Sequence, residues 1–380
     1  MSDQLSNLGN SYTRRFERFG RLEDINKAVE YETQAISISP ENHAALPNWL
    51  NNLGVSHCGR FQRLGNLDDV DKAITYQTRA VALTSENHLD LPDRLVNLGS
   101  SHHGRFERLN RLEDIDLAVA YMTRAVSLAP EDQVNLPAWL NSLAISHLSR
   151  FRRLGNLDDI SESIKHQTRA VALTSPDHPD LPSLLNNLGV AHHQQFQRLE
   201  QQNDIEFSIL HLTRAVALIP TGHADAPSCL TNLGVSYGCR CTHSNLLEDI
   251  EKAINFQSRA VELTPPDHPN MPSRLNYLAA SHYTRFKLQP KRDYLLCALD
   301  CYLKSSLSSV GHPSSKFRAA RNWGRLASSY GISNPIQAYQ VALDLVPRLV
   351  WLGDSIGNRY DDIREMSDLA VDAASIAIER

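Results

Sequence analysis

One five-residue pattern, the Leu-Asn-Asn-Leu-Gly of residues 50–54, recurs every 45 residues along this chain. A phenylalanine keeps the same step, and Cys241 is the one exception to it. A fixed period of this size indicates an array of supersecondary units, each of which buries its apolar face only against its neighbours. We therefore expect one continuous array rather than two or three ordinary domains. The copies of the pattern begin at Leu5, Leu50, Leu95, Leu140, Leu185, Leu230 and Leu275.

Each unit reads as two helices, as residues 46–90 illustrate. Pro47 suits a first helical turn, and the apolar positions from Leu50 to Leu64 are spaced by three and four residues, which is typical of one buried helical stripe. Gly65 then marks a helix end, and the acids at 68–69 suit the start of a second helix. No stretch of the unit alternates with a period of two, so the sequence predicts an all-α array with one antiparallel helix pair per repeat.

Composition excludes several classes of partner. The formal net charge of -5 gives no sign of binding to nucleic acid, and no run of 18 apolar residues predicts a membrane span. The polar N-terminus does not resemble a signal peptide, and six irregularly placed cysteines do not form a disulfide framework. We expect a cytoplasmic protein that binds neither nucleic acid nor membrane.

Small residues at Gly54, Ala73 and Ala80 fall where two helices must approach closely. This spacing resembles the tetratricopeptide (TPR) repeat, whose helix-A glycine and two helix-B alanines these residues match; His57 stands where that family usually has a tyrosine. The resemblance implies a right-handed superhelical solenoid. The common TPR has 34 residues, so each helix here is expected to be about one turn longer, as in the long TPRs of kinesin light chains. HEAT repeats share the 45-residue period, but the glycine and alanine pattern favours TPR.

The chain also resembles fungal TPR arrays that precede a caspase-like CHAT protease domain. Residues 167–173 (QTRAVAL) and 317–323 (FRAARNW) carry this likeness. Because such arrays continue into the protease, we expect either a truncated product or a genuine short form. The predicted layout is seven helix pairs over residues 1–310, a degenerate eighth pair over 311–353 with a kink at Pro347, and a capping helix over 354–380.

Two groups of residues could suggest a metal site. A histidine ladder (His57, His102, His147, His192 and His282) is expected to pack, because successive units lie roughly 10 Å apart, too far to share a metal ion. The cluster of Cys229, Cys239, Cys241 and His243 lacks zinc-site spacing. No protease motif or phosphate-binding glycine loop occurs. We expect no enzyme activity, no metal and no cofactor.

Arginines and acids also repeat every 45 residues. The interpretation favoured here is a ladder of ion pairs and helix caps that joins the two helices of each unit, rather than an electrostatic binding stripe. The arginines are Arg15, Arg60, Arg105, Arg150, Arg240 and Arg285, and the acids are Asp24, Asp69, Asp114, Asp159, Asp204 and Asp249.

Asparagines are the best candidates for binding. The TPR resemblance implies that the second, fifth, sixth, ninth, twelfth and thirteenth positions of each first helix face a concave groove. A carboxamide both donates and accepts hydrogen bonds, so a row of them can hold an extended peptide by its backbone. The alternative is that these side chains cap local carbonyls or face water. The candidates are Asn7, Asn51, Asn52, Asn97, Asn141, Asn186, Asn187, Asn232 and Asn276.

The leading hypothesis is a non-catalytic scaffold that binds protein or peptide segments in this groove. The groove lacks the lysines and arginine with which chaperone-binding TPRs hold a terminal carboxylate. The alternative hypothesis is the sensor or regulatory region of a CHAT protease system, with the protease domain in cis or in trans. A third is a purely structural spacer or oligomer.

Overall fold

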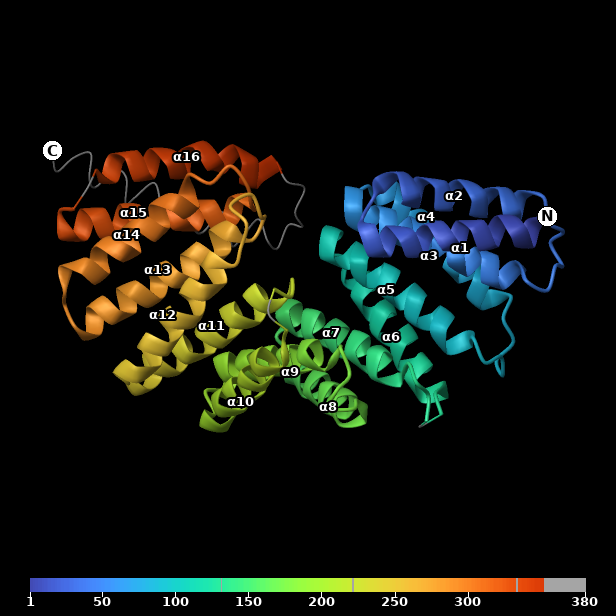
Figure 1. Cartoon of the computed structure of the whole chain (residues 1–380), viewed down its shortest axis with the longest axis horizontal. Helices are drawn as coiled ribbons and strands as arrows, with labels where there is room; N and C mark the ends of the chain where they lie inside the picture. The colour runs from blue at the N-terminus through green and yellow to red at the C-terminus, as the bar shows by residue number, and fades with distance from the viewer. Residues whose placement is uncertain (131, 221, 333, 352–380) are drawn as a thin grey trace. The chain divides into compact units, whose positions relative to one another are not determined.

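A computed structural model describes residues 1–130, 132–220, 222–332 and 334–351. Within those ranges the chain forms sixteen α-helices and no strand (Figure 1). The helices are α1 (Ser2–Phe19), α2 (Leu22–Ser37), α3 (Leu46–Leu64), α4 (Leu67–Ala82), α5 (Leu91–Leu109), α6 (Leu112–Leu128), α7 (Leu136–Leu154), α8 (Leu157–Leu173), α9 (Leu181–Leu199), α10 (Gln202–Leu218), α11 (Ala226–Ser244), α12 (Leu247–Glu262), α13 (Met271–Leu288), α14 (Arg292–Ser306), α15 (Pro313–Tyr330) and α16 (Pro335–Trp351).

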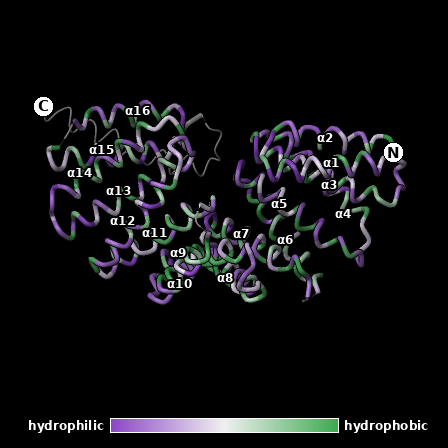
Figure 2. The backbone as a smooth tube through the Cα atoms, viewed as in Figure 1, coloured by the Kyte–Doolittle hydropathy of each residue, from purple (hydrophilic) through white to green (hydrophobic). Residues whose placement is uncertain are grey.

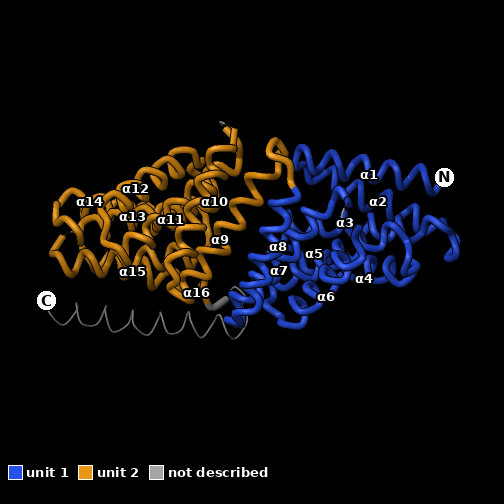
Figure 3. Tube along the Cα trace, turned by 90° about the horizontal axis from the view of Figure 1, so that it is seen from below, with its two compact units in different colours: residues 1–173 blue, residues 174–380 orange. Residues whose placement is uncertain are grey.

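Each odd-numbered helix packs most extensively on the even-numbered helix that follows it, and we call these the A helix and B helix of a repeat. The chain divides into two compact units, unit 1 over residues 1–173 and unit 2 over residues 174–380 (Figure 3). Within each unit, successive pairs stack in chain order. The predicted all-α array of helix pairs is confirmed. Pro347 lies inside α16, and the predicted capping helix over 354–380 lies outside the described residues.

The repeated glycine permits the close approach of the two helices in a pair. A Cβ atom on Gly54 would lie 3.2 Å from the carbonyl oxygen of Ala73 and 2.5 Å from Cγ of Gln77. Ala73 and Ala80 are themselves completely buried. The small residues therefore set the distance between α3 and α4, as the sequence pattern predicts.

A buried ion pair links the two helices of most repeats, and α3 and α4 show its geometry. Asp69 is 2 % exposed; Arg60 donates to it from Nε at 3.0 Å, and His57 Nδ1 lies 2.8 Å from Asp69 Oδ1. Burial would raise the pKa of Asp69, but Arg60 and His57 outweigh that effect and hold it below its ordinary value. The predicted ladder of ion pairs is confirmed for Arg15, Arg60, Arg105, Arg150 and Arg240, and His57 is a packed member of it. The prediction was wrong for Arg285, because Tyr294 stands nine positions after it and Arg285 donates to Glu251 on α12 instead.

The same arginines also reach the preceding repeat. Arg105 Nη1 donates to Asp71 on α4 at 2.7 Å, and Arg150 Nη1 donates to Asp116 on α6 at 3.0 Å. In unit 2, Arg240 Nη1 donates to Glu206 on α10 at 2.6 Å. One side chain therefore ties its own B helix to the previous one, an arrangement that the sequence reading did not foresee.

The repeat at α9 and α10 departs from this pattern. Its arginine position holds Gln195, and Asp204, which is 7 % exposed, has one carboxylate oxygen without a hydrogen-bond partner among the described residues. His192 Nδ1 lies 3.3 Å from the other oxygen. This repeat holds a buried acid with an incomplete set of partners.

Hydrophobic positions are spread along the helices. Figure 2 shows hydrophilic positions between hydrophobic ones in the labelled helices. Over the described ranges no helix combines the length and the apolar content that crossing a membrane requires. In that same part of the chain no group of three or more His, Cys, Asp or Glu side chains is placed to hold a metal ion.

Candidate functional site

All nine candidate asparagines lie on A helices. Asn7 is exposed and the others are half-buried. The structure brings three of them, Asn7 from α1 and Asn51 and Asn52 from α3, into one pocket in unit 1. The remaining six lie outside that pocket: Asn97 on α5, Asn141 on α7, Asn186 and Asn187 on α9, Asn232 on α11 and Asn276 on α13.

Amides on neighbouring A helices bond to each other. Asn97 Nδ2 donates to Asn51 Oδ1 at 3.1 Å, and Asn232 Nδ2 donates to Asn186 Oδ1 at 2.9 Å. In both pairs the residues are 46 positions apart, so the sixth position of one repeat contacts the fifth position of the repeat before it. The amides therefore form part of the contact between repeats, and only some of their donors and acceptors stay available.

Two further candidates also bond within the protein. Gln167 Nε2 on α8 donates to Asn141 Oδ1 at 2.9 Å. Asn276 Nδ2 donates to the Ser315 carbonyl oxygen at 2.7 Å, while its own Oδ1 is buried with no hydrogen-bond partner among the described residues. Neither of these amides is fully free to meet a ligand.

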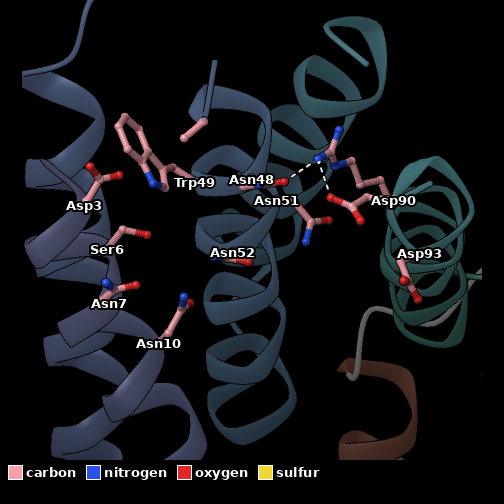
Figure 4. A pocket seen from close by; sticks show the side chains of 12 residues that line it. Asp3, Ser6, Asn7, Asn10, Asn48, Trp49, Asn51, Asn52, Asp90 and Asp93 are labelled. Atoms are coloured by element: carbon pink, nitrogen blue, oxygen red, sulfur yellow. Dashed lines mark hydrogen bonds and ion pairs between the residues drawn. The ribbon is translucent and has the colours of Figure 1, made fainter. Parts of the chain in front are cut away.

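The pocket in unit 1 is an open recess with a volume of about 440 Å³ across three A helices. Figure 4 shows Ser6, Asn7 and Asn10 pointing from α1 toward α3, with Asp90 and Asp93 on the far side of α3. Its walls are mainly polar. The lining residues are Asp3, Ser6, Asn7, Asn10, Ala45, Asn48, Trp49, Asn51, Asn52, Asp90, Asp93 and Arg94.

Three amides in this pocket remain unpaired. The side chains of Asn7, Asn10 and Asn52 make no hydrogen bond with any described residue, and Asn51 uses only its oxygen. A free carboxamide offers an acceptor oxygen and two N–H donors. The pocket can therefore bond to both the N–H and the C=O groups of a peptide backbone.

Arg94 lines the pocket, but its guanidinium is already hydrogen-bonded within the protein. It is 3 % exposed and donates to Thr84 and Asn48, and to Asp90 Oδ2 at 3.2 Å. Burial lowers its pKa, and Asp90 opposes that effect. The guanidinium holds Asn48 and Asp90 in place, so it does not offer a free clamp for a ligand carboxylate.

Sequence reasoning missed Asn10, Asn48 and Arg94. A signal existed for Asn48, because it occupies the second position of its repeat, which the TPR resemblance already assigned to the groove. Arg94 had no such signal, because its partners lie ten positions earlier at Thr84 and 46 positions earlier at Asn48. A pattern read along one helix does not show contacts of that kind.

Unit 2 contains a smaller pocket of different character. Its volume is about 180 Å³, and its lining is mainly apolar, including Val216, Ile219 and Leu230. None of the candidate asparagines lines it. The polar pocket of unit 1 thus brings together three of the nine sequence-predicted asparagines, Asn7, Asn51 and Asn52.

Solved structures similar to this chain are helical repeat proteins. The C-terminal part of a TPR repeat-containing protein from Cytophaga hutchinsonii is 12% identical with a TM-score of 0.51, covering 81% of this chain and 95% of that one. A human IFIT1 dimer with PPP-AAAA is 14% identical with a TM-score of 0.53, covering 96% of this chain and 73% of that one. TPR-like repeats of a putative kinesin light chain from Podosopora anserina are 14% identical with a TM-score of 0.43, covering 57% of this chain and 98% of that one.

The first two likenesses show the fold, a TPR-like solenoid of helix pairs, and the predicted fold class is confirmed. The third has too low a TM-score to support an argument. No protein-family model matches the sequence, and the curated proteins give no match. The likeness to fungal CHAT-associated arrays stays a prediction from the sequence.

Proposed function

We propose that this protein is a non-catalytic interaction module that binds an extended segment of a partner protein across the A helices of unit 1. The observation that carries the proposal is the group of unpaired amides, Asn7, Asn10 and Asn52, in one open polar pocket. An extended peptide presents N–H and C=O groups along both edges. Free carboxamides are the side chains that match both groups.

The spacing of the helices fits such a ligand. Packed helices lie about 8–10 Å apart, and an extended chain rises about 3.3 Å per residue. One A helix therefore meets about every third residue of a strand that crosses the stack. The Asn97–Asn51 bond supports this arrangement, because it fixes the oxygen of Asn51 and leaves the Asn51 N–H groups free to donate.

Replacing two of the unpaired amides tests the proposal. The protein is screened against a displayed library of random blocked peptides, and a captured peptide is measured by fluorescence anisotropy. Each lost hydrogen bond is worth about 1 kcal/mol, so Asn7→Ala with Asn52→Ala is expected to weaken binding by about tenfold or more. Circular dichroism should not change, because neither side chain bonds within the fold.

Asn255→Ala is the matched control. Asn255 is exposed on α12, a B helix of unit 2, so its loss should leave peptide affinity unchanged. Equal affinity of the wild type and the Asn7/Asn52 variant for the same peptide would contradict the proposed binding mode. Light scattering over a range of concentrations addresses the rival hypothesis of a structural oligomer.

The CHAT-sensor alternative makes a separate prediction. It requires a His/Cys protease domain either in the same reading frame beyond Arg380 or in a second protein that this chain binds. Reading the genomic DNA that follows the codon for Arg380 tests the first form directly. A pull-down from the native organism tests the second.

A further inference from the structure

We propose, on the basis of the binding function above, that the segment bound by the unit 1 pocket is basic. One lysine or arginine side chain of the ligand meets Asp3 on α1, and a second meets Asp93 on α5. The ligand backbone crosses α3 between them, against the unpaired amides.

The charges that line the pocket favour a cationic ligand. Three carboxylates face it, those of Asp3, Asp90 and Asp93, and the one cation in the lining is the guanidinium of Arg94. That guanidinium is already shared between Asp90 and the oxygens of Asn48 and Thr84. Asp3 and Asp93 form no ion pair with any described residue, so the pocket carries an uncompensated negative charge.

The surroundings of Asp93 point the same way. Burial raises the pKa of Asp93, and the neighbouring charge of Asp90 raises it further, although hydrogen bonds from Trp139 and Asn135 oppose the shift. Two carboxylates held near each other and partly removed from water repel. A cation placed against Asp93 would relieve both the burial penalty and the repulsion.

Ser6 provides an independent sign of a ligand. Its side chain is 2 % exposed, lines the pocket and forms no hydrogen bond with any described residue. Figure 4 shows it between Asp3 and Asn7, pointing from α1 toward α3. The oxygen faces the pocket without a partner in the described part of the chain, so an ammonium or guanidinium group held by Asp3 would donate to it.

The repeat itself shows that the acids are not needed for packing. Asp3 and Asp93 occupy the same position in the first and third repeats, two periods apart. In the first three repeats of unit 2 that position holds serine, at Ser183, Ser228 and Ser273, and the helices still pair. Carboxylates at this position are therefore a feature of the pocket rather than of the fold.

The separation of the two acids sets the length of the ligand. Two steps between neighbouring A helices amount to about 16–20 Å, which an extended chain covers in about six residues. About four residues should thus lie between the two basic residues of the ligand. A cluster of adjacent lysines would reach only one of the two acids.

The peptide-library screen tests this inference separately from the proposed function. The wild type should enrich peptides with lysine or arginine at two positions about five apart. The variant Asp3→Ser with Asp93→Ser carries the residue that unit 2 uses, so it should fold, still capture peptides and lose the basic enrichment. Its affinity for a basic peptide selected by the wild type should fall about tenfold.

A charge-matched control removes the same charge elsewhere in unit 1. Glu17 and Glu113 are exposed and do not line the pocket, so Glu17→Gln with Glu113→Gln should keep the basic enrichment. Raising the salt concentration from about 50 mM to about 500 mM should weaken binding of the selected peptide to the wild type, because it screens exposed charges.

The outcomes separate the two proposals. Capture of peptides without basic enrichment would overturn the inference about charge and leave the peptide-binding function standing. Loss of basic enrichment in the Glu17/Glu113 control as well would assign it to overall charge and also overturn the inference. Failure of the wild type to capture any peptide would overturn both proposals.

Discussion

Glu32 gives a quantitative test of the packing inside the first repeat. It lies on α2, is 1 % exposed, and neither of its carboxylate oxygens has hydrogen-bond geometry with a described residue. Its Cγ lies against Gly9 on α1. Burial raises its pKa from 4.5 to about 7, and the nearby Ser56 hydroxyl offsets only part of that shift. Three later repeats carry glutamine at this position, in Gln77, Gln167 and Gln257.

Because the pKa of Glu32 is raised, its contribution to the free energy of unfolding decreases as the pH rises. In the unfolded chain the carboxyl loses its proton near pH 4.5, whereas in the folded chain it keeps the proton until about pH 7. The contribution of Glu32 to stability is therefore fully present below pH 4.5 and is lost as the pH rises between these two values. Since one pKa unit corresponds to 1.36 kcal/mol, the full loss is about 3 kcal/mol.

Glu32→Gln should remove that loss. We expect no gain in the free energy of unfolding near pH 4 and a gain of about 3 kcal/mol at pH 8. Urea unfolding followed by circular dichroism measures the total effect. Hydrogen exchange of the α1 and α2 amides, corrected for its intrinsic pH dependence, measures the local effect, which matters because repeat arrays open locally.

The equivalent substitution one repeat later is the matched control. Gln77→Glu should introduce the same decline in stability between about pH 4.5 and pH 7 into α3 and α4. Identical pH dependence of the wild type and Glu32→Gln over this range would refute the argument. It would mean that the Glu32 carboxyl is not desolvated.

Three further predictions concern the repeat framework. Gly54→Val should lower the free energy of unfolding by about 1–3 kcal/mol through overpacking, measured by urea unfolding. Gln195→Arg should give Asp204 the partner that it lacks and raise that free energy by about 1–2 kcal/mol; an unchanged or lower melting temperature would contradict this. Asp69→Asn should cost about 2–3 kcal/mol at pH 7 by leaving the half-buried Arg60 guanidinium unpaired. That difference should shrink below pH 3.8, the ordinary pKa of the carboxyl, since the wild type loses the pair as Asp69 becomes protonated.

The sequence predicted those features that depend on the period itself. The spacing of Leu50, Leu53 and Phe61 identified the A helix, and Gly54 with Ala73 located the close approach between helices. The nine-residue step from Arg60 to Asp69 identified the ion pair, because the turn between the two helices has the same length in each of the first six repeats. Each of these contacts lies within one helix pair.

Contacts between repeats were much less predictable. The bond from Asn97 to Asn51 joins residues 46 positions apart, and the bond from Arg105 to Asp71 joins residues 34 apart. Both depend on the stagger between neighbouring helix pairs, which the sequence does not state. For the same reason the sequence could not show which of the asparagine amides would bond to each other and which would keep their donors and acceptors available. The convergence of Asn7, Asn10 and Asn52 in one pocket became visible only in the structure.

The doubly bonded arginines have a consequence for how such a chain can change its length. Every link that they make joins positions a fixed number of residues apart, either within a repeat or to the one before it. Removing residues 67–111 would place Asp114 nine positions after Arg60, the separation that Arg60 and Asp69 have now. A gain or loss of one whole period therefore preserves these separations, whereas an insertion of any other length breaks the links that span it. Recombination between repeats can therefore lengthen or shorten this protein in steps of 45 residues while the spacing of these links is kept.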